Sequence, residues 1–135
     1  MKKLSKLLLG TLLTILATII VAGCTSMNDS ETGYQNGYYI AKLNHDFNDV
    51  YQATINSISS GITYDENGHA YNLLENSEIN NKATITAVNN EDPNDRLEII
   101  IAKISKNNTK IMIKCADHDD SIRSSALLDT INQQL

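Results

Sequence analysis

The sequence predicts a single α+β domain, in which an antiparallel sheet of four to five strands carries two amphipathic helices on one face. Three observations predict it. Several short segments alternate apolar and polar residues, which is typical of half-buried strands. Two longer segments, one early and one C-terminal, repeat apolar residues at helical spacing. The length of 135 residues fits one core and leaves little room for a second. The expected order is β-α-β-β-β-β-α.

The chain opens with the pattern of an export signal. Three lysines within the first six residues precede an uncharged apolar run from Leu7 to Ala22, and Gly23 and Cys24 follow it. This arrangement predicts that residues 1–23 are removed from the mature chain. An uncleaved membrane anchor is the alternative, but the run is short for a hydrocarbon core about 30 Å thick.

The residues at the end of this run resemble the lipobox of bacterial lipoproteins. Val21, Ala22, Gly23 and Cys24 give a branched apolar residue, two small residues and a cysteine. The resemblance implies that the Cys24 thiol receives a diacylglyceryl group and that a peptidase cuts before it. Two or more acyl chains suffice for stable anchoring to a membrane. Thr25, in place of the aspartate typical of inner-membrane retention, implies the outer membrane in a cell that has two.

Charge limits the partners of the exported domain. Removal of residues 1–23 takes three lysines away, so eight basic residues remain against 16 acidic ones, and the formal net charge becomes −8. With no Trp and no basic cluster, the composition argues against a nucleic-acid partner. A net negative charge predicts repulsion from anionic lipid headgroups at short range and favours a basic protein partner.

The folded domain is expected to span residues 37–135. Residues 24–36 comprise the lipidated Cys24 and a polar segment without apolar periodicity, which we interpret as a flexible tether. Residues 37–43 are aromatic and β-prone and predict the first strand. Its two faces carry Tyr38, Ile40 and Lys42, and Tyr39, Ala41 and Leu43.

A first helix is predicted over residues 47–58, because apolar positions recur there at helical spacing. Asp46 can cap its start and Gly61 can end it. The stripe comprises Phe47, Val50, Tyr51, Thr54 and Ile58.

The segment after this helix is ambiguous. Residues 62–64 are strand-like, and Asn67-Gly68 is a strong hairpin signal. Residues 66–81 can form either a strand or a helical turn, and both interpretations stay open.

Three further strands are predicted over residues 82–88, 96–105 and 110–116, with a turn at Asn107-Asn108. The last helix follows an acidic run in which Asp120 is the expected cap. Its stripe comprises Ser124, Leu127, Leu128, Ile131 and Leu135.

Several of these patterns resemble the small bacterial lipoproteins of domain-of-unknown-function family 3568 over residues 37–135. They are the strand ending at Leu43, the helix segment 50–54, the strand pair around Ile99 and Ile111, and the Asp119-Asp120-Ser121 start of the last helix. The glycine-rich tract that often follows the lipidated cysteine in that family is reduced here to Gly33 and Gly37. The resemblance implies a fold and a location, and it implies no activity.

No pattern of catalytic, metal-binding or cofactor-binding residues stands out. Four consecutive residues cannot all face one ion, so residues 117–120 are interpreted as helix capping. His45-Asp46 and His118-Asp119 lack any nucleophile motif, although Ser59 and Ser60 are available. Cys115 alternates with polar residues and is expected to be a buried small hydrophobe.

The leading hypothesis is therefore a non-enzymatic lipoprotein of the bacterial cell envelope that contacts another envelope protein. Tyr38, Tyr39 and Tyr51 are the candidate ligand or partner surface. The alternative is a small-molecule or lipid-binding module with its ligand between the sheet and the helix faces that carry Tyr51 and Leu128. A hydrolase would need His45 or His118 beside a carboxylate and a nucleophile.

Overall fold

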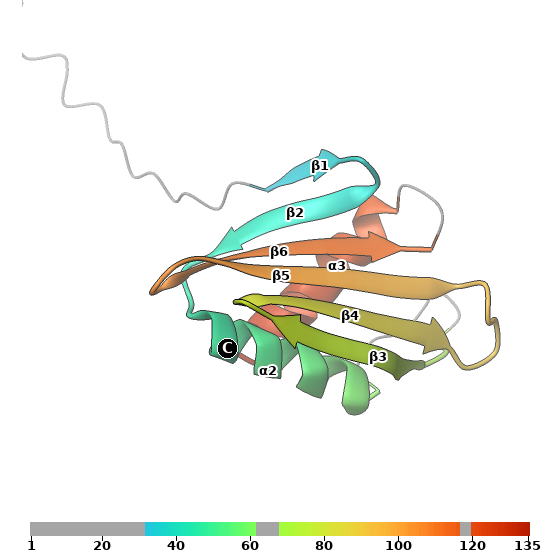
Figure 1. Cartoon of the computed structure of the whole chain (residues 1–135). Coiled ribbons are helices and arrows are strands. Elements are labelled where there is room, and N and C mark those ends of the chain that lie inside the picture. Colours follow the sequence, from blue (N-terminus) through green and yellow to red (C-terminus); the bar gives the residue numbers. More distant parts are fainter. Residues whose placement is uncertain (1–31, 62–67, 117–119) are drawn as a thin grey trace, which may run out of the picture.

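The computed structural model describes residues 32–61, 68–116 and 120–135. Within these ranges the chain forms six strands and two helices (Figure 1). In chain order they are β1 (Gly33–Gln35), β2 (Tyr38–Leu43), α2 (Phe47–Ser59), β3 (Tyr71–Ile79), β4 (Lys82–Asn89), β5 (Arg96–Ser105), β6 (Asn108–Cys115) and α3 (Ser121–Asn132).

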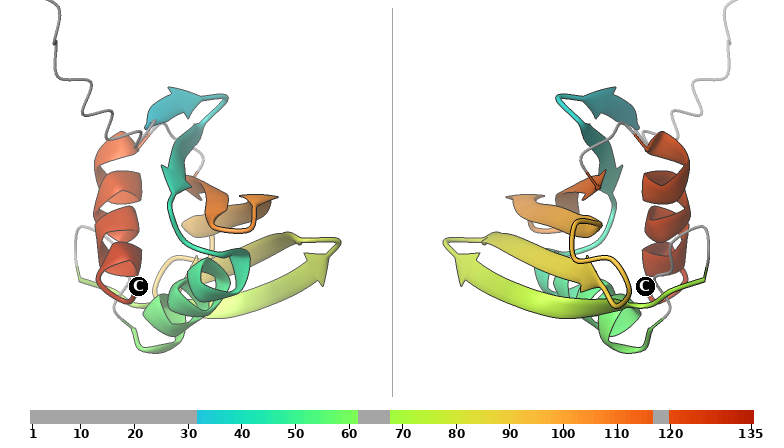
Figure 2. Two further views of the ribbon diagram at one scale, coloured as in Figure 1. Left: turned by 90° about the vertical axis from the view of Figure 1, so that its left-hand side faces the viewer. Right: turned by 90° about the vertical axis from the view of Figure 1, so that its right-hand side faces the viewer.

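The strands form one antiparallel sheet in the order β1-β2-β6-β5-β4-β3, so β5 and β6 lie near its middle. Both helices pack on the same face of the twisted sheet and contact each other, as Figure 2 shows. We call this the helix-covered face and the opposite one the outer face. The α+β class and the antiparallel sheet are confirmed, with six strands in place of the four to five that were predicted.

The additional strand is β1, which lies in the segment expected to be part of the tether. Its three residues pair with the first half of β2, from Gly33 opposite Ile40 to Gln35 opposite Tyr38. The connection is the pair Asn36 and Gly37, with φ of 54° and 82°. A two-residue Asn-Gly turn with positive φ at both positions suits a tight hairpin. Residues 33–35 show no apolar alternation, so the sequence pattern does not indicate a strand before this turn.

The ambiguity after α2 is resolved in favour of a strand over Tyr71–Ile79. It pairs along its length with β4, with an irregularity between Leu73 and Glu75. Because β3 is an edge strand, most of its side chains are exposed, and its sequence lacks clean alternation. Residues 62–64 and Asn67 lie outside the described residues, so those parts of the prediction stay predictions.

Both helices begin where predicted. Asp46 Oδ1 accepts a hydrogen bond from the Asp49 N–H at 3.0 Å, and Asp120 Oδ1 accepts one from the Arg123 N–H at 2.9 Å. These are N-cap bonds, which satisfy amides that have no partner inside the helix. Gly61 follows α2 with a φ of 65°, a left-handed conformation that glycine adopts without strain.

The core lies between the sheet and the two helices. Buried and less buried side chains alternate along each central strand. Ile99 is fully buried, whereas Ile100 faces the outer side and is half-buried. Ala41 and Leu43, which the sequence places together on one face of the first strand, take part in it, as do most residues of the stripe predicted on the last helix. The cluster includes Ala41, Leu43, Phe47, Val50, Ile58, Ile85, Ile99, Ile101, Ile111, Ile113, Cys115, Leu127, Leu128 and Ile131.

This alternation gives a test of the fold. Ile99→Ala is expected to lower the free energy of unfolding by about 2–5 kcal/mol, because it leaves a cavity in the core. Ile100→Ala, one residue along on the outer face, is expected to cost only about 1 kcal/mol. Urea denaturation of both variants measures the difference, and equal losses would contradict the assignment of the two faces.

Candidate functional site

The three tyrosines proposed as one surface lie in three different places. Tyr38 and Tyr39 alternate along β2, so Tyr38 is on the outer face and Tyr39 on the helix-covered face. Tyr51 is on α2, in partial contact with the core. The structure therefore does not gather them into a single patch, and each has its own surroundings.

Tyr38 is held in a small polar network on the outer face. Its hydroxyl donates a hydrogen bond to Glu98 Oε1 at 2.6 Å, and Lys114 Nζ lies 6.0 Å from the ring centroid. The hydrogen bond to the carboxylate is the main cause that raises the pKa of Tyr38 to about 12. The hydroxyl thus stays protonated and joins strands β2 and β5 across β6.

Tyr51 fastens the edge of the sheet to α2. Its ring stacks on Phe47 with centroids 6.1 Å apart, and its hydroxyl donates to Asn76 Oδ1 on β3 at 2.8 Å. Leu128, the other residue of the predicted internal ligand site, is only 5% exposed and belongs to the core cluster. Core side chains fill the space between the sheet and the helix faces that carry Tyr51 and Leu128. The contacts of Tyr51 with Phe47 and Asn76 give it a structural role.

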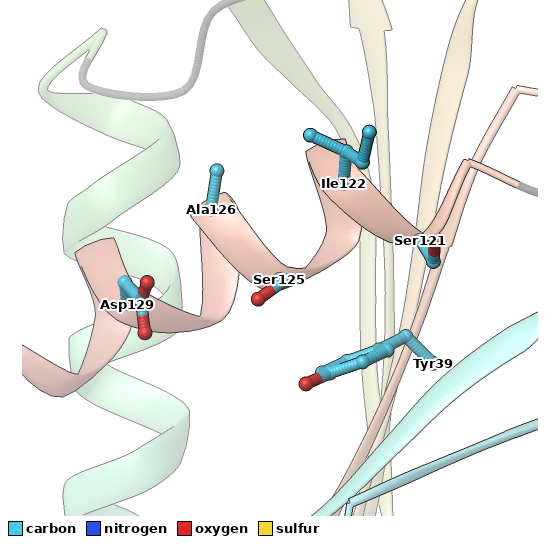
Figure 3. Close-up of a pocket in the computed structure, with 6 residues that line it drawn as sticks. All are labelled: Tyr39, Ser121, Ile122, Ser125, Ala126 and Asp129. Atoms are coloured by element: carbon cyan, nitrogen blue, oxygen red, sulfur yellow. The ribbon is translucent and has the colours of Figure 1, made fainter.

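Tyr39 lines an open groove between β2 and α3, with a volume of about 480 Å³. Figure 3 shows its ring alongside the helix, with the hydroxyl end on the side of Ser125. Tyr34 lies opposite Tyr39 in the β1–β2 register and extends the same side of the sheet. The groove is lined by Tyr39, Ser121, Ile122, Ser125, Ala126 and Asp129.

The helical side of the groove combines apolar and acidic groups on one face of α3. Ile122 is 82% exposed, and Ala126 and Asp129 follow it at spacings of four and three residues. Asp129 lies in the last turn, where the helix carries no basic residue. A carboxylate near the negative end of a helix dipole is unfavourable, and a nearby cation relieves that repulsion. The groove can therefore accept an apolar side chain together with a basic one.

A second polar cluster lies where α3 begins, and sequence reasoning missed it. Arg123 Nη2 forms an ion pair with Asp95 Oδ2 at 3.1 Å, and Asn89 Nδ2 donates to the same oxygen at 3.1 Å. The Tyr71 hydroxyl donates to Asp95 and accepts from Arg123, whose guanidinium carbon lies 5.7 Å from the ring centroid. The cluster ties α3 to β3 and to the β4–β5 loop. No local spacing in the sequence indicates it, since Tyr71, Asp95 and Arg123 are 24 to 52 residues apart.

Cys115 lies close to this cluster as a buried free thiol, as the alternation predicted. It is 2% exposed and accepts a hydrogen bond from Ser124 Oγ at 3.4 Å. Burial is the main cause that raises its pKa to about 11. The thiolate, which is the nucleophilic form, is therefore scarce at neutral pH.

The residues considered for catalysis are separated. His45 precedes the cap of α2, whereas Ser59 and Ser60 lie at its far end, beyond a helix of 13 residues. At 1.5 Å per residue that separation is about 20 Å, too long for a nucleophile and its base.

Other proposed residues fall outside the description. Two sets of candidate residues lie outside the described residues. They are the lipobox residues Val21, Ala22, Gly23 and Cys24, and the run 117–119 that includes His118. Asp120, the described member of the acidic run, acts as the helix cap. Over residues 32–61, 68–116 and 120–135 there is no cluster of three or more His, Cys, Asp or Glu side chains suited to a metal ion. In the same ranges no helix combines the length and the apolar character needed to cross a bilayer.

The fold and the groove define a small α+β domain with one helix-covered face and one open face. The chain belongs to the family described as a protein of unknown function, DUF3568, whose profile matches residues 6–134 and thus nearly the whole chain. The resemblance noted from the sequence is confirmed. A comparison with curated proteins gave no match.

The environment of Cys115 predicts slow alkylation in the folded protein. A rise in pKa from 9.0 to about 11 lowers the thiolate fraction at pH 8 about 100-fold. Iodoacetamide should therefore modify Cys115 about 100-fold more slowly in buffer than in urea, and mass spectrometry of the labelled protein measures both rates. Similar rates in both conditions would contradict the burial of this thiol.

Proposed function

We propose that this chain is a non-enzymatic lipoprotein of the bacterial cell envelope, anchored to a membrane through Cys24, whose folded domain binds another envelope protein. The lipobox-like residues 21–24 after an apolar run support the anchor. The family match supports it as well, because it begins at residue 6 and so includes the apolar run and Cys24.

The observation that carries the binding role is the groove between β2 and α3. Its occupant is a polypeptide segment of the partner that presents an apolar side chain next to a lysine or arginine. The apolar side chain packs on Ile122, Ala126 and Tyr39, and the basic group pairs with Asp129. Charge complementarity supports this occupant, since Asp129 forms no ion pair within the described residues and opposes the helix dipole.

The geometry of the nucleophilic side chains supports a non-enzymatic role. Ser59 and Ser60 are about a helix length from His45, and Cys115 is buried and protonated. Arg123 and Asp95 pair at 3.1 Å and tie α3 to the β4–β5 loop.

The anchor is tested by Cys24→Ala. Cells that express the wild type and are fed a radiolabelled fatty acid should yield a labelled mature protein, whereas the variant should stay an unlabelled precursor of higher mass. Cys115→Ala is the matched control and should keep the label, because it removes the other cysteine. Persistent labelling of Cys24→Ala would overturn the anchor.

The groove is tested with a photo-crosslinking amino acid in place of Ala126 in intact cells. The expected product joins residue 126 to one envelope protein, at a peptide in which an apolar residue adjoins a lysine or arginine. Asp129→Lys should reduce this product at least tenfold, since it replaces attraction by repulsion; a swing of about 1.4 kcal/mol is enough for a factor of ten. Glu91→Lys, an exposed acidic residue in the β4–β5 loop, is the matched control and should leave it unchanged.

Loss of the product in Asp129→Lys cannot be attributed to unfolding. A lysine in the last turn of a helix favours the dipole and stabilises by about 0.3–1 kcal/mol. Crosslinks to lipid, to a small molecule or to a second copy of the chain would overturn the proposed occupant. Equal losses in Asp129→Lys and Glu91→Lys would do the same.

A further inference from the structure

The charges of the folded domain are separated along the strands. All eight basic residues downstream of Cys24 are described, and five of them lie at the end of the sheet that holds the β3–β4 and β5–β6 turns. Figure 1 shows both turns at that end and the β4–β5 loop at the other. The five are Lys42, Lys82, Lys103, Lys106 and Lys110. We call this end the basic end.

Three of these lysines share one cross-strand row on the outer face. The register places Lys42 opposite Lys110, Lys110 opposite Ala102, Ala102 opposite Lys82, and Lys82 opposite Ile79. Residues that are directly opposite in an antiparallel sheet project from the same face. Lys42 and Lys110 therefore face solvent together, an arrangement of like charges that destabilises a sheet and that an anionic surface would relieve.

Each hairpin tip adds an exposed isoleucine to these charges. Ile79 precedes the β3–β4 turn and is 67% exposed, and Ile104 precedes the β5–β6 turn and is 54% exposed. The tips are adjacent, since the Lys103 N–H donates to the Asn81 carbonyl at 3.0 Å. An exposed apolar side chain flanked by lysines is the combination that binds the interface of an anionic bilayer.

The row itself holds no acidic residue. On the outer face, Glu75 and Glu98 each lie four residues along their strand from it, about 13 Å away. Asp46 shares a pocket with Lys103 and Lys106, at the start of α2 on the helix-covered side.

Glu91, Asp92, Asp95 and Asp120 lie at the opposite end, about 30 Å away along the ten residues of β5. That distance is several times the Debye length of about 8 Å at physiological salt. Glu78 shares the basic end but is opposite the buried Ala83, so the register directs it to the helix-covered face. A surface that meets the row on the outer face therefore meets Lys42, Lys82 and Lys110 first.

The chain enters β1 opposite the middle of β2, on the side that faces the basic end. Gly33 pairs with Ile40 and Gln35 with Tyr38, so β1 runs antiparallel to β2 and starts on the side toward Lys42. Seven residues lie between Cys24 and Thr32, so an extended chain of eight residue steps reaches at most about 29 Å. A lipid on Cys24 would therefore keep the domain within about 29 Å of the membrane, a distance at which the basic end can reach the headgroups.

We propose that the basic end docks on the anionic headgroups of the membrane that holds the anchor, with Lys42, Lys82 and Lys110 on the headgroups and the two hairpin tips at the interface. This docking rests on the proposed anchoring at Cys24. It reverses the repulsion that net charge alone predicts, because the eight basic residues are not spread evenly.

The test uses the full mature protein purified from cells and reconstituted on vesicles of phosphatidylcholine alone or of phosphatidylcholine with phosphatidylglycerol. Hydrogen exchange of the amides in the two hairpin tips is followed by mass spectrometry. We expect slower exchange on the anionic vesicles only. The protection should vanish at about 1 M salt, where the Debye length falls to about 3 Å.

A matched pair of variants separates these lysines from net charge. Lys82→Gln with Lys110→Gln should lower the ratio of docked to undocked protein about 25-fold, since each lysine near an anionic surface contributes about fivefold. Arg96→Gln with Lys114→Gln changes the net charge equally, at outer-face positions nearer the other end, and should leave the tips protected. All four side chains are on the solvent-facing side of the sheet, so the fold should tolerate each change.

The intact mass of the purified protein decides the anchor separately. A mass without acyl chains would overturn the anchoring, and with it the docking. An acylated protein with equal exchange of the tips on both kinds of vesicle would overturn the docking alone. Equal effects of the two double variants would also overturn it, as would a photo-crosslinker at residue 106 that captured an acidic protein in cells instead of lipid.

Discussion

The burial of one sheet face under two helices is the constraint on which the rest of the structure depends. Ile85, Ile99 and Ile113 are fully buried on that face, so the central strands cannot slip by one residue without exposing the core. The same register determines which residues share rows on the outer face. The alignment of Lys42, Lys82 and Lys110 is therefore a consequence of core packing. The positive charge of these side chains is not needed for that packing, so it can contribute to binding.

The two ends of the strands have different chemistry for physical reasons. At one end α3 begins with an N-cap aspartate, and Arg123 pairs with Asp95 to tie the helix to the loop beside it. Removing one member of such a pair would leave a partly buried charge without compensation. At the other end the hairpin tips carry exposed isoleucines and lysines whose side chains form no ion pair among the described residues. The ion pair that ties α3 to the sheet thus lies at one end, and the exposed lysines of the hairpin tips lie at the other.

Helices and strands with a regular spacing of apolar residues could be predicted from the sequence. Contacts between residues that are distant in the sequence could not. The stripes and caps of both helices, with Asp46 and Asp120, follow from local spacing and hydrogen bonding. The edge strands were missed or ambiguous because one side of each is open and alternation is weak. The Asn36-Gly37 turn was a readable signal for β1. The Arg123–Asp95 pair, the groove at Tyr39 and the lysine row all join distant residues, so composition and net charge conceal them.

The groove attracts a cationic group and the basic end attracts an anionic surface, and the two sites lie on different faces of the sheet, so they can be occupied at the same time. The groove offers Asp129 to a cation, whereas the row offers lysines to an anionic surface. If the basic end lies on the membrane, the strands project away from it and the groove between β2 and α3 opens to the side, where a partner in the envelope can reach it. Orientation by the bilayer would then fix the direction of the groove and reduce the rotational freedom lost on binding. Docking and partner binding would support each other without any change in the fold.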